Sequence, residues 1–160
     1  MTEGQVLAAR ENGAYVIRLV GDVRLTLCAS IEDYVESMLG DPEFSSVWVD
    51  LCDAEGIDST TLGQLAKLAL AVHERYEFRP ALYSQNASIN RLLGSMGLDQ
   101  LFEMHASACA AAHCNQSIPM VPGSEDAVRE KVIEAHRTLM DVSDSNRKRF
   151  SELVATLERG

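Results

Sequence analysis

Short strand-like segments alternate with amphipathic helical segments along most of the chain, and this alternation constrains the fold more than any other feature. Strand patterns occupy residues 5–10, 14–21, 46–51, 81–83 and 101–104. Helix patterns occupy residues 26–39, 60–76 and 87–95. A helix between two strands is the connection that lets the strands run parallel in one sheet. The sequence therefore predicts an α/β fold with a mainly parallel sheet and helices packed on it.

The connections add detail to this expectation. Asn12-Gly13 joins the first two strand segments, and this pair tolerates the positive φ angles of a tight hairpin turn. The opening strands should therefore be antiparallel, which makes the sheet mixed. Residues 53–57 are expected to form a loop, and residues 105–114 a short Ala-rich helix.

Two prolines and a glycine interrupt the pattern in residues 117–123. Such residues are typical of a connecting segment, because proline cannot continue a helix or donate to a central strand. We therefore expect a domain over residues 1–116, a linker over 117–123 and a helical extension over 124–160.

The extension contains neither Pro nor Gly over residues 125–159, and its apolar residues recur at helical spacing. Two helices that turn near Ser143–Ser145 fit this pattern better than one helix of about 35 residues, which would be roughly 50 Å long. Three roles stay open for the extension: packing back on the sheet, forming a homodimer, or serving as a docking helix.

Charge distinguishes the two parts of the 160-residue chain, whose net charge is −10. By count, residues 1–124 carry 16 acidic and 7 basic side chains, whereas residues 125–160 carry 8 and 7. An acidic body repels nucleic-acid phosphates, so we expect a protein partner with a basic face and no nucleic acid. The acidity could equally serve solubility alone.

Several features indicate a protein of the cytoplasm. No apolar run approaches the roughly 20 residues of a membrane-spanning helix. The opening segment MTEGQVLAARENG lacks the basic and apolar regions of a secretory signal. The four cysteines show no CxxC spacing, which favours free thiols in a reducing compartment. We therefore expect no membrane partner.

Catalytic and metal-binding patterns are weak. His105, Cys109 and His113 would share one face of the expected Ala-rich helix, a spacing that could ligate zinc or copper. No carboxylate accompanies them, so an ordinary packed helix is the better interpretation. The chain also lacks the GxxxxGKS and GxSxG patterns of phosphate-binding loops and hydrolase nucleophiles. We expect no metal, no cofactor and no enzymatic activity.

The most informative motif is Ile57–Gly63 (IDSTTLG), which connects the strand pattern of residues 46–51 to the helix pattern of residues 60–76. An Asp followed by three hydroxyl residues can cap a helix, because their oxygens accept from the unpaired first-turn N–H groups. A phosphate at the same place would add close to two negative charges and would repel a partner surface packed against it. The residues alone leave both interpretations open, a helix cap or a phosphorylation switch.

This motif resembles the signature of the STAS domain, as found in bacterial anti-sigma factor antagonists. Two further segments resemble the same family in order and spacing: VIRLVGD at residues 16–22 and SINRLLGSMGL at residues 88–98. The resemblance covers roughly residues 5–115. It implies a STAS-like mixed, mainly parallel sheet with helices packed on it, to which the extension is added.

The resemblance also implies a function, namely transcription regulation by partner switching. In this family an anti-sigma factor that is a serine kinase phosphorylates the serine after the Asp, and a PP2C-type phosphatase removes the phosphate. The unphosphorylated form binds the anti-sigma factor. The matching residue is Ser59, with Thr60 as a secondary candidate. Partner contact is then expected around the motif and the nearby strand end, at Asp22, Arg24, Asp58, Thr61 and Leu62.

Two positions depart from the family pattern. Thr61 stands where the family has Gly, and Arg24 stands where it usually has an acidic residue. Arg24 could pair with a phosphate or contact an acidic partner. The alternative function is a STAS module that is not phosphorylated and acts as a scaffold or ligand-binding subunit of a transport or sensor complex.

Overall fold

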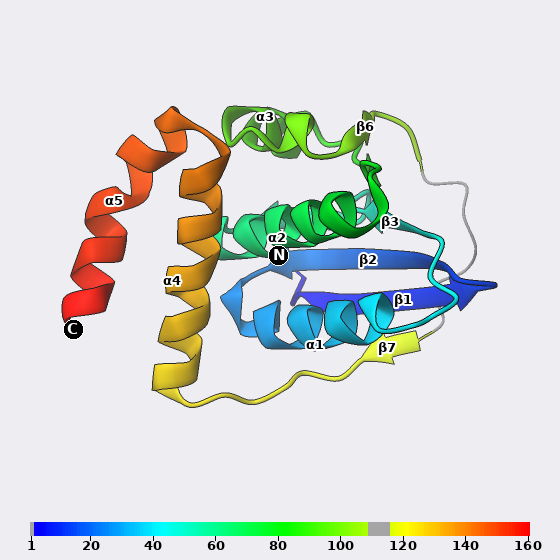
Figure 1. Ribbon diagram of the computed structural model, residues 1–160, viewed down its shortest axis with the longest axis horizontal. Coiled ribbons are helices and arrows are strands. Elements are labelled where there is room, and N and C mark those ends of the chain that lie inside the picture. Colours follow the sequence, from blue (N-terminus) through cyan, green and yellow to red (C-terminus); the bar gives the residue numbers. More distant parts are fainter. Residues whose placement is uncertain (1, 109–115) are drawn as a thin grey trace.

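The computed structural model describes residues 2–108 and 116–160, and seven strands of this part form one mixed sheet (Figure 1). The strands are β1 (Gln5–Glu11), β2 (Ala14–Val23), β3 (Ser46–Asp50), β4 (Ala54–Ile57), β5 (Ala81–Tyr83), β6 (Glu103–His105) and β7 (Gln116–Ile118). Their order is β6-β5-β3-β2-β1-β7, and β4 pairs with the C-terminal end of β2. Strand β1 is antiparallel to β2 and β7, and the other pairs are parallel. The expected mixed, mainly parallel sheet is confirmed.

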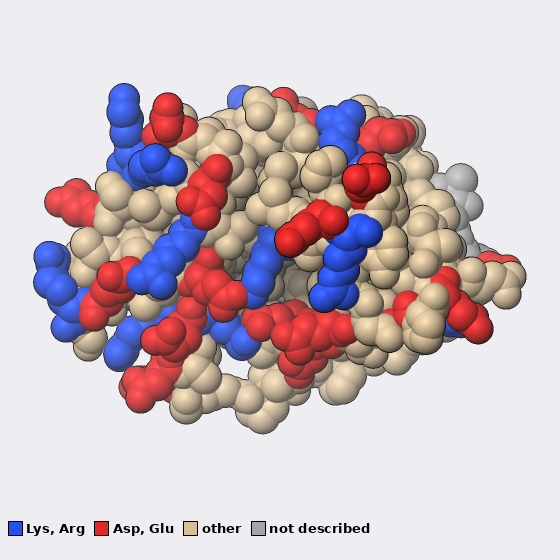
Figure 2. Space-filling model, in the orientation of Figure 1, with Lys and Arg blue, Asp and Glu red and all other residues tan. Residues whose placement is uncertain are grey.

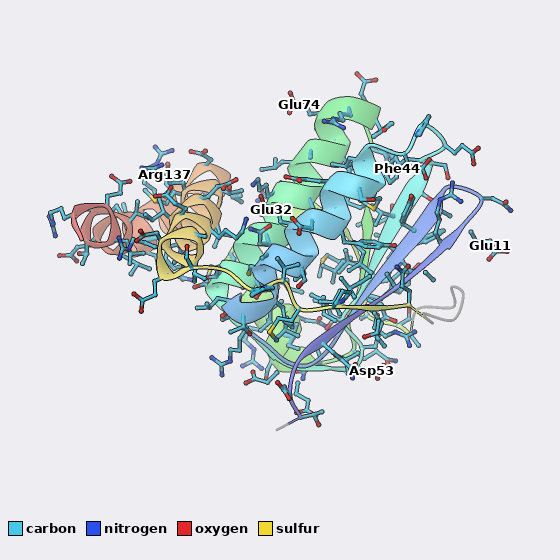
Figure 3. All side chains as sticks on the ribbon, turned by 90° about the horizontal axis from the view of Figure 1, so that it is seen from below. Glu11, Glu32, Phe44, Asp53, Glu74 and Arg137 are labelled. Carbon is cyan, nitrogen blue, oxygen red and sulfur yellow. The ribbon has the colours of Figure 1, made fainter. Side chains whose placement is uncertain are left out.

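Helices connect and cover these strands. They are α1 (Cys28–Leu39), α2 (Ser59–Tyr76), α3 (Ala87–Ser95), α4 (Glu125–Val142) and α5 (Asp144–Arg159), with short 3₁₀ turns η1 (Leu25–Leu27) and η2 (Leu98–Gln100). Figure 3 shows α1 and α2 side by side on one face of the sheet, and the α4–α5 hairpin beyond them, away from the sheet. No helix in the described part of the chain is long and apolar enough to cross a membrane.

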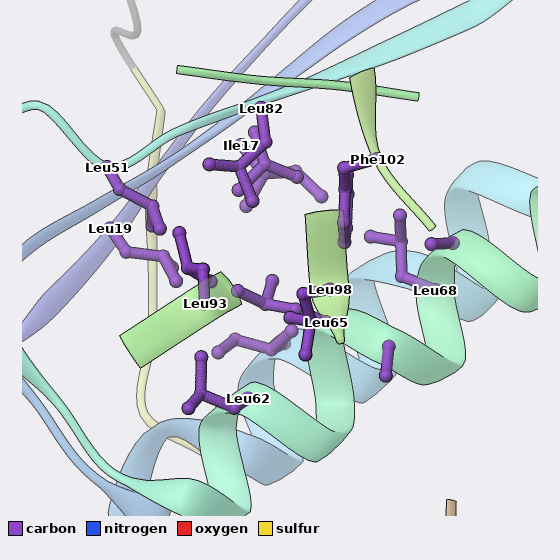
Figure 4. Close-up of a cluster of buried hydrophobic side chains, with 14 of the residues drawn as sticks. Ile17, Leu19, Leu51, Leu62, Leu65, Leu68, Leu82, Leu93, Leu98 and Phe102 are labelled. Atoms are coloured by element: carbon purple, nitrogen blue, oxygen red, sulfur yellow. The ribbon is translucent and has the colours of Figure 1, made fainter. Parts of the chain in front are cut away.

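The core lies between α2 and the sheet (Figure 4). The apolar stripe expected for α2 is buried as a whole, and its members are Leu62, Leu65, Leu68, Ala69 and Val72. Alternate residues of the strands face it, including Ile17, Leu19 and Leu82. Each such buried aliphatic side chain contributes about 1.5–3 kcal/mol relative to an exposed one, so the start of α2 is anchored firmly.

The turn between β1 and β2 has the geometry that its sequence predicts. Asn12 and Gly13 both have positive φ, at 51° and 83°. Two successive residues of this kind match the twist of the flanking strands and close a tight hairpin.

Two local predictions are wrong. Residues 53–57 are not simply a loop, because β4 (Ala54–Ile57) pairs with β2 through Gly21–Val23. Residues 105–108 are not helical, because His105 ends β6, which pairs with β5. The remainder of the expected Ala-rich helix, including Cys109 and His113, lies outside the described residues.

The expected linker over residues 117–123 is partly in the sheet. Strand β7 (Gln116–Ile118) pairs with β1, so the first residues of this segment belong to the domain. Ser30 on α1 fastens the next residues, because its Oγ donates to Pro119 O and accepts from Val121 N, both at 2.9 Å. The chain therefore reaches α4 along the edge of α1.

The extension forms the expected helical hairpin. Ser124 caps α4 by accepting from Ala127 N, and Ser143 caps α5 by accepting from Asn146 N. Among the three roles left open, the described structure has the hairpin folded back on the same chain, and it packs on α2 rather than on the sheet (Figure 1).

Candidate functional site

Asp58 performs the capping at the start of α2. Its Oδ1 accepts from the backbone N–H of Thr61 at 2.9 Å and from the Thr61 hydroxyl at 2.7 Å. Its Oδ2 accepts from Leu25 N at 2.7 Å. One carboxylate thus joins the first turn of α2 to the connection between β2 and α1, and an N-cap of this kind contributes about 0.5–2 kcal/mol.

Ser59 is the first residue of α2, and its hydroxyl does not cap the helix. Ser59 Oγ lies 2.8 Å from Nε2 of His136 on α4. His136 Nδ1 lies 2.7 Å from Val132 O, and a carbonyl can only accept, so Nδ1 carries a proton. In the neutral ring Nε2 then accepts from the Ser59 hydroxyl.

His136 contacts the candidate site, and the sequence did not reveal it. Its side chain is buried, with 2% of the residue exposed, and its ring meets Phe150 of α5 edge-on at 4.9 Å. A single His beside the apolar stripe of a helix is usually only a packed residue, so no local signal marked it. Its contact with Ser59 spans 77 residues of sequence.

The two threonines after Ser59 face inward. Thr60 is 4% exposed and Thr61 is fully buried. The Thr61 hydroxyl, besides donating to Asp58, lies 3.8 Å from Cys28 Sγ. Burial raises the pKa of the Cys28 thiol to about 12, despite the contact with Thr61, so this cysteine is inert at neutral pH. Thr61 therefore supports the first turn of α2 from inside.

The expected partner-binding residues divide into two groups. Arg24 Nε lies 3.0 Å from both carboxylate oxygens of Asp22, and this pair lies at the surface beside the β2–η1 connection. Asp58 is partly exposed. Thr61 and Leu62 are buried and serve the core, so in this state they are not part of an accessible surface.

Helix α4 approaches α2 closely at Gly63. A Cβ on Gly63 would lie 2.4 Å from Ala135 O and 2.6 Å from Ala135 Cβ, distances that no side chain tolerates. The two backbones are therefore in direct contact one turn after Ser59. Glycine and alanine are the residues that permit such an approach between helices.

Charged side chains line the rim of this contact. Lys67 pairs with Glu134, and Lys131 donates to Glu32 at 2.8 Å. Burial alone would raise the pKa of Glu32, but the hydrogen bond from Lys131 and the positive charges of Lys67 and Lys131 outweigh it and lower the pKa. These pairs link α4 to both α1 and α2.

The histidine and cysteine set considered for a metal is only partly described. His105 lies 3.0 Å from Glu103 and stacks on Tyr83 at 4.8 Å. Cys109, His113 and Cys114 lie outside the described residues. Within residues 2–108 and 116–160, no group of three or more His, Cys, Asp or Glu could hold a metal ion.

Comparison with known proteins gives matches among solved structures. No protein-family model and no curated protein matches the chain. Among solved structures, an anti-sigma factor antagonist from Mycobacterium paratuberculosis aligns with a TM-score of 0.53 at 19% identity. The alignment covers 66% of this chain and 87% of that one. The chain therefore shares the α/β fold of that solved structure, in agreement with the STAS-like fold that the sequence predicts.

Proposed function

We propose that the chain is an anti-sigma factor antagonist in a phosphorylation-controlled partner switch. It binds an anti-sigma factor, or an equivalent regulator, while Ser59 is unphosphorylated. One observation carries the proposal: Asp58 caps α2, so the Ser59 hydroxyl is not needed for the cap. The helix-cap interpretation that competed with a switch applies to Asp58 and not to Ser59.

A phosphate on Ser59 would act through charge. It would bring close to two negative charges to a site that already holds Asp58, with Asp22 on the neighbouring strand. The N–H groups of the first turn of α2 would stabilise it locally, so the sheet and α2 stay folded. A partner that packs flat on this surface would be repelled. Thr60 is the weaker candidate because its side chain is buried.

The partners of this switch are proteins. A serine kinase, which is the anti-sigma factor itself in the family pattern, adds the phosphate, and a PP2C-type phosphatase removes it. The net charge of −10 favours a basic protein face over a nucleic acid. We propose a binding role in the bacterial cytoplasm, without catalysis.

Binding of the anti-sigma factor by single-site variants tests the proposal. Ser59→Ala should bind at least as tightly as the wild type, whereas Ser59→Asp should bind at least tenfold more weakly than Ser59→Ala, since the added charge faces the partner. Ser88→Asp is the matched control, because Ser88 lies exposed in the first turn of α3 and receives the same charge at another helix start. Equal binding by Ser59→Ala and Ser59→Asp would contradict the proposed interface and favour the scaffold alternative.

A further inference from the structure

The hairpin of α4 and α5 covers the proposed switch, and we propose that it is a displaceable lid. When it is docked, it covers Ser59 and the face of α2 that follows Ser59. When it is undocked, that face becomes a groove that accepts one amphipathic helix of a protein partner. This inference rests on the proposed function for the class of partner, but its test needs neither phosphate nor an anti-sigma factor.

Gly63 shows that the α2 face is built to receive a helix. The three nearest atoms to a Cβ at this position all belong to Ala135 of α4. A glycine inside a helix costs about 1 kcal/mol relative to alanine. Outside its own helix, the closest obstacle to a side chain at Gly63 is the hairpin, so the glycine serves the docking of a second helix.

Side chains on either side of Gly63 complete the docked state. Ser59 bonds to His136 one turn before it, and Lys67 pairs with Glu134 one turn after it. Away from α2, Asn146 of α5 donates to the carbonyl oxygen of Met96, the residue that follows α3, at 2.8 Å. The hairpin also buries Ile133, Leu139 and Phe150. The polar contacts make docking of the hairpin specific. The buried residues make its docked face partly apolar.

Other features make the docked state weak enough to open. The rim ion pairs are partly exposed, and pairs of this kind contribute at most about 1 kcal/mol each. An apolar cavity of about 180 Å³ lies under the start of α4, with Leu25 and Met120 beside it. These two side chains are 38% and 54% exposed, so the packing at this end is incomplete.

The hairpin can move as one body. Its two helices are joined to each other by the ring contact of His136 with Phe150 and by the ion pair of Arg137 with Glu158. Ser30 fastens the chain at Pro119 and Val121, so residues 122–124 are the free connection to α4, and three extended residues reach about 10 Å. In Figure 1 the hairpin lies at one end of the molecule, with α5 on the outside. It can therefore leave α2 without unfolding the sheet.

The docked face of α4 indicates the partner that the groove fits. Such a helix has a small residue opposite Gly63, apolar residues about one turn on either side, and an acidic side chain that reaches Lys67. A basic side chain opposite Glu32 completes the match, as Lys131 does in α4. Figure 2 shows acidic and basic side chains interleaved over this side of the molecule. The partner helix and the hairpin would compete for one surface.

A labelled synthetic peptide of residues 124–160 serves as the probe, added to the full-length protein. In the wild type the tethered hairpin competes at an effective concentration on the order of mM, so the peptide should bind weakly. Ala135→Leu enlarges the hairpin at the Gly63 contact and leaves the body unchanged. We expect this variant to bind the peptide at least tenfold more tightly than the wild type.

Two glycine variants complete the design. Gly63→Ala obstructs the groove itself, so it should open the hairpin and fail to bind the peptide. Gly94→Ala on α3 is the matched control, because a Cβ there meets nothing within 4 Å, and it should behave as the wild type. Equal binding of the peptide by the wild type and Ala135→Leu, or tight binding by Gly63→Ala, would contradict the proposal that the hairpin is a displaceable lid.

Amide hydrogen exchange of the wild type tests the same claim without any variant. The amides of α4 and α5 should exchange at least tenfold faster than the most protected amides of β2 and β3, since the hairpin opens separately. Exchange of both regions through one common unfolding event would overturn the lid. If the peptide results hold but Ser59 is never phosphorylated, the lid stands and the proposed switch fails.

Discussion

The hydrogen bond between Ser59 and His136 is expected to hold the hairpin on the body. Ser59→Ala removes the donor and leaves Nε2 of a buried ring without a partner. A hydrogen bond contributes about 0.5–1.5 kcal/mol net, and an unsatisfied buried acceptor costs about 1–3 kcal/mol. Because Ser59 itself is half-buried, water relieves part of this cost. We expect the free energy of hairpin opening to fall by about 1–2 kcal/mol.

His136→Ala should cost more, because it also removes the contact with Phe150 and leaves a void. An aromatic pair contributes about 0.5–1.5 kcal/mol beyond its buried area, and truncation of a large buried side chain adds a cavity term. The expected loss is about 2–4 kcal/mol. In the double variant the Ser59 hydroxyl has already lost its partner, so its removal should add little. The coupling energy of the two substitutions is therefore expected to be about 1 kcal/mol.

Amide hydrogen exchange of α4 under native conditions measures these opening energies, since 1.4 kcal/mol is a tenfold change in exchange rate. Ser88→Ala serves as the control, because Ser88 lies in the exposed first turn of α3. In a cycle with His136→Ala, the effects of the two substitutions on the opening free energy should be additive. A coupling below about 0.3 kcal/mol for Ser59 and His136 would refute the view that this bond holds the lid.

Three further outcomes follow from the site. A phosphate on Ser59 has no room while Oγ lies 2.8 Å from His136 Nε2, so phosphorylated protein should show faster proteolysis of the hairpin; unchanged protection would contradict this. Because the pKa of Glu32 is lowered in the folded state, its contribution is present above the ordinary pKa of about 4.5 and lost as pH falls below it. Hairpin opening should thus increase between pH 6 and pH 3.5, and Glu32→Gln should reduce that increase; an identical pH profile for the variant would refute the role of the Lys131 pair. Asp58→Ala should lower stability by about 2 kcal/mol, which for a chain of this size is a Tm decrease of about 4–8 °C by calorimetry; an unchanged Tm would show that its three hydrogen bonds are not needed.

The sequence predicted most elements because local pattern and tertiary structure agree there. The stripe of α2 is fully buried, and Asn12-Gly13 forms the tight turn that its positive φ angles require. The hairpin of the extension also turns at Ser143, as the polar run around that residue predicts. In these segments, packing reinforces the preference that each residue already has.

The errors arose where tertiary contacts override a weak local signal. Strand β4 has the sequence AEGI, in which Gly and Glu disfavour a strand, and it exists because β2 continues past Gly21 and offers free backbone groups. Residues 105–108 carry helix-favouring alanine, but pairing of β6 with β5 fixes His105 as extended.

The site itself was predicted in part. The motif Ile57–Gly63, which resembles the STAS signature, identifies Asp58 and Ser59, but it does not divide their roles, since both residue types can cap a helix. The hydrogen bonds of Asp58 with Thr61 and Leu25 assign the cap to Asp58. The sequence could not predict that His136 contacts Ser59. The apolar residues of the extension predict two helices, but they do not show on which surface of the domain the helices pack.

The central claim is that Ser59 carries a phosphate in the cell. The direct measurement is mass spectrometric mapping of phosphate on the full-length protein, purified from cells across all growth phases. We expect a phosphorylated peptide with the modification on Ser59 in at least one phase, and its loss in Ser59→Ala. Protein in which Ser59 and Thr60 both stay unmodified in every phase would contradict it.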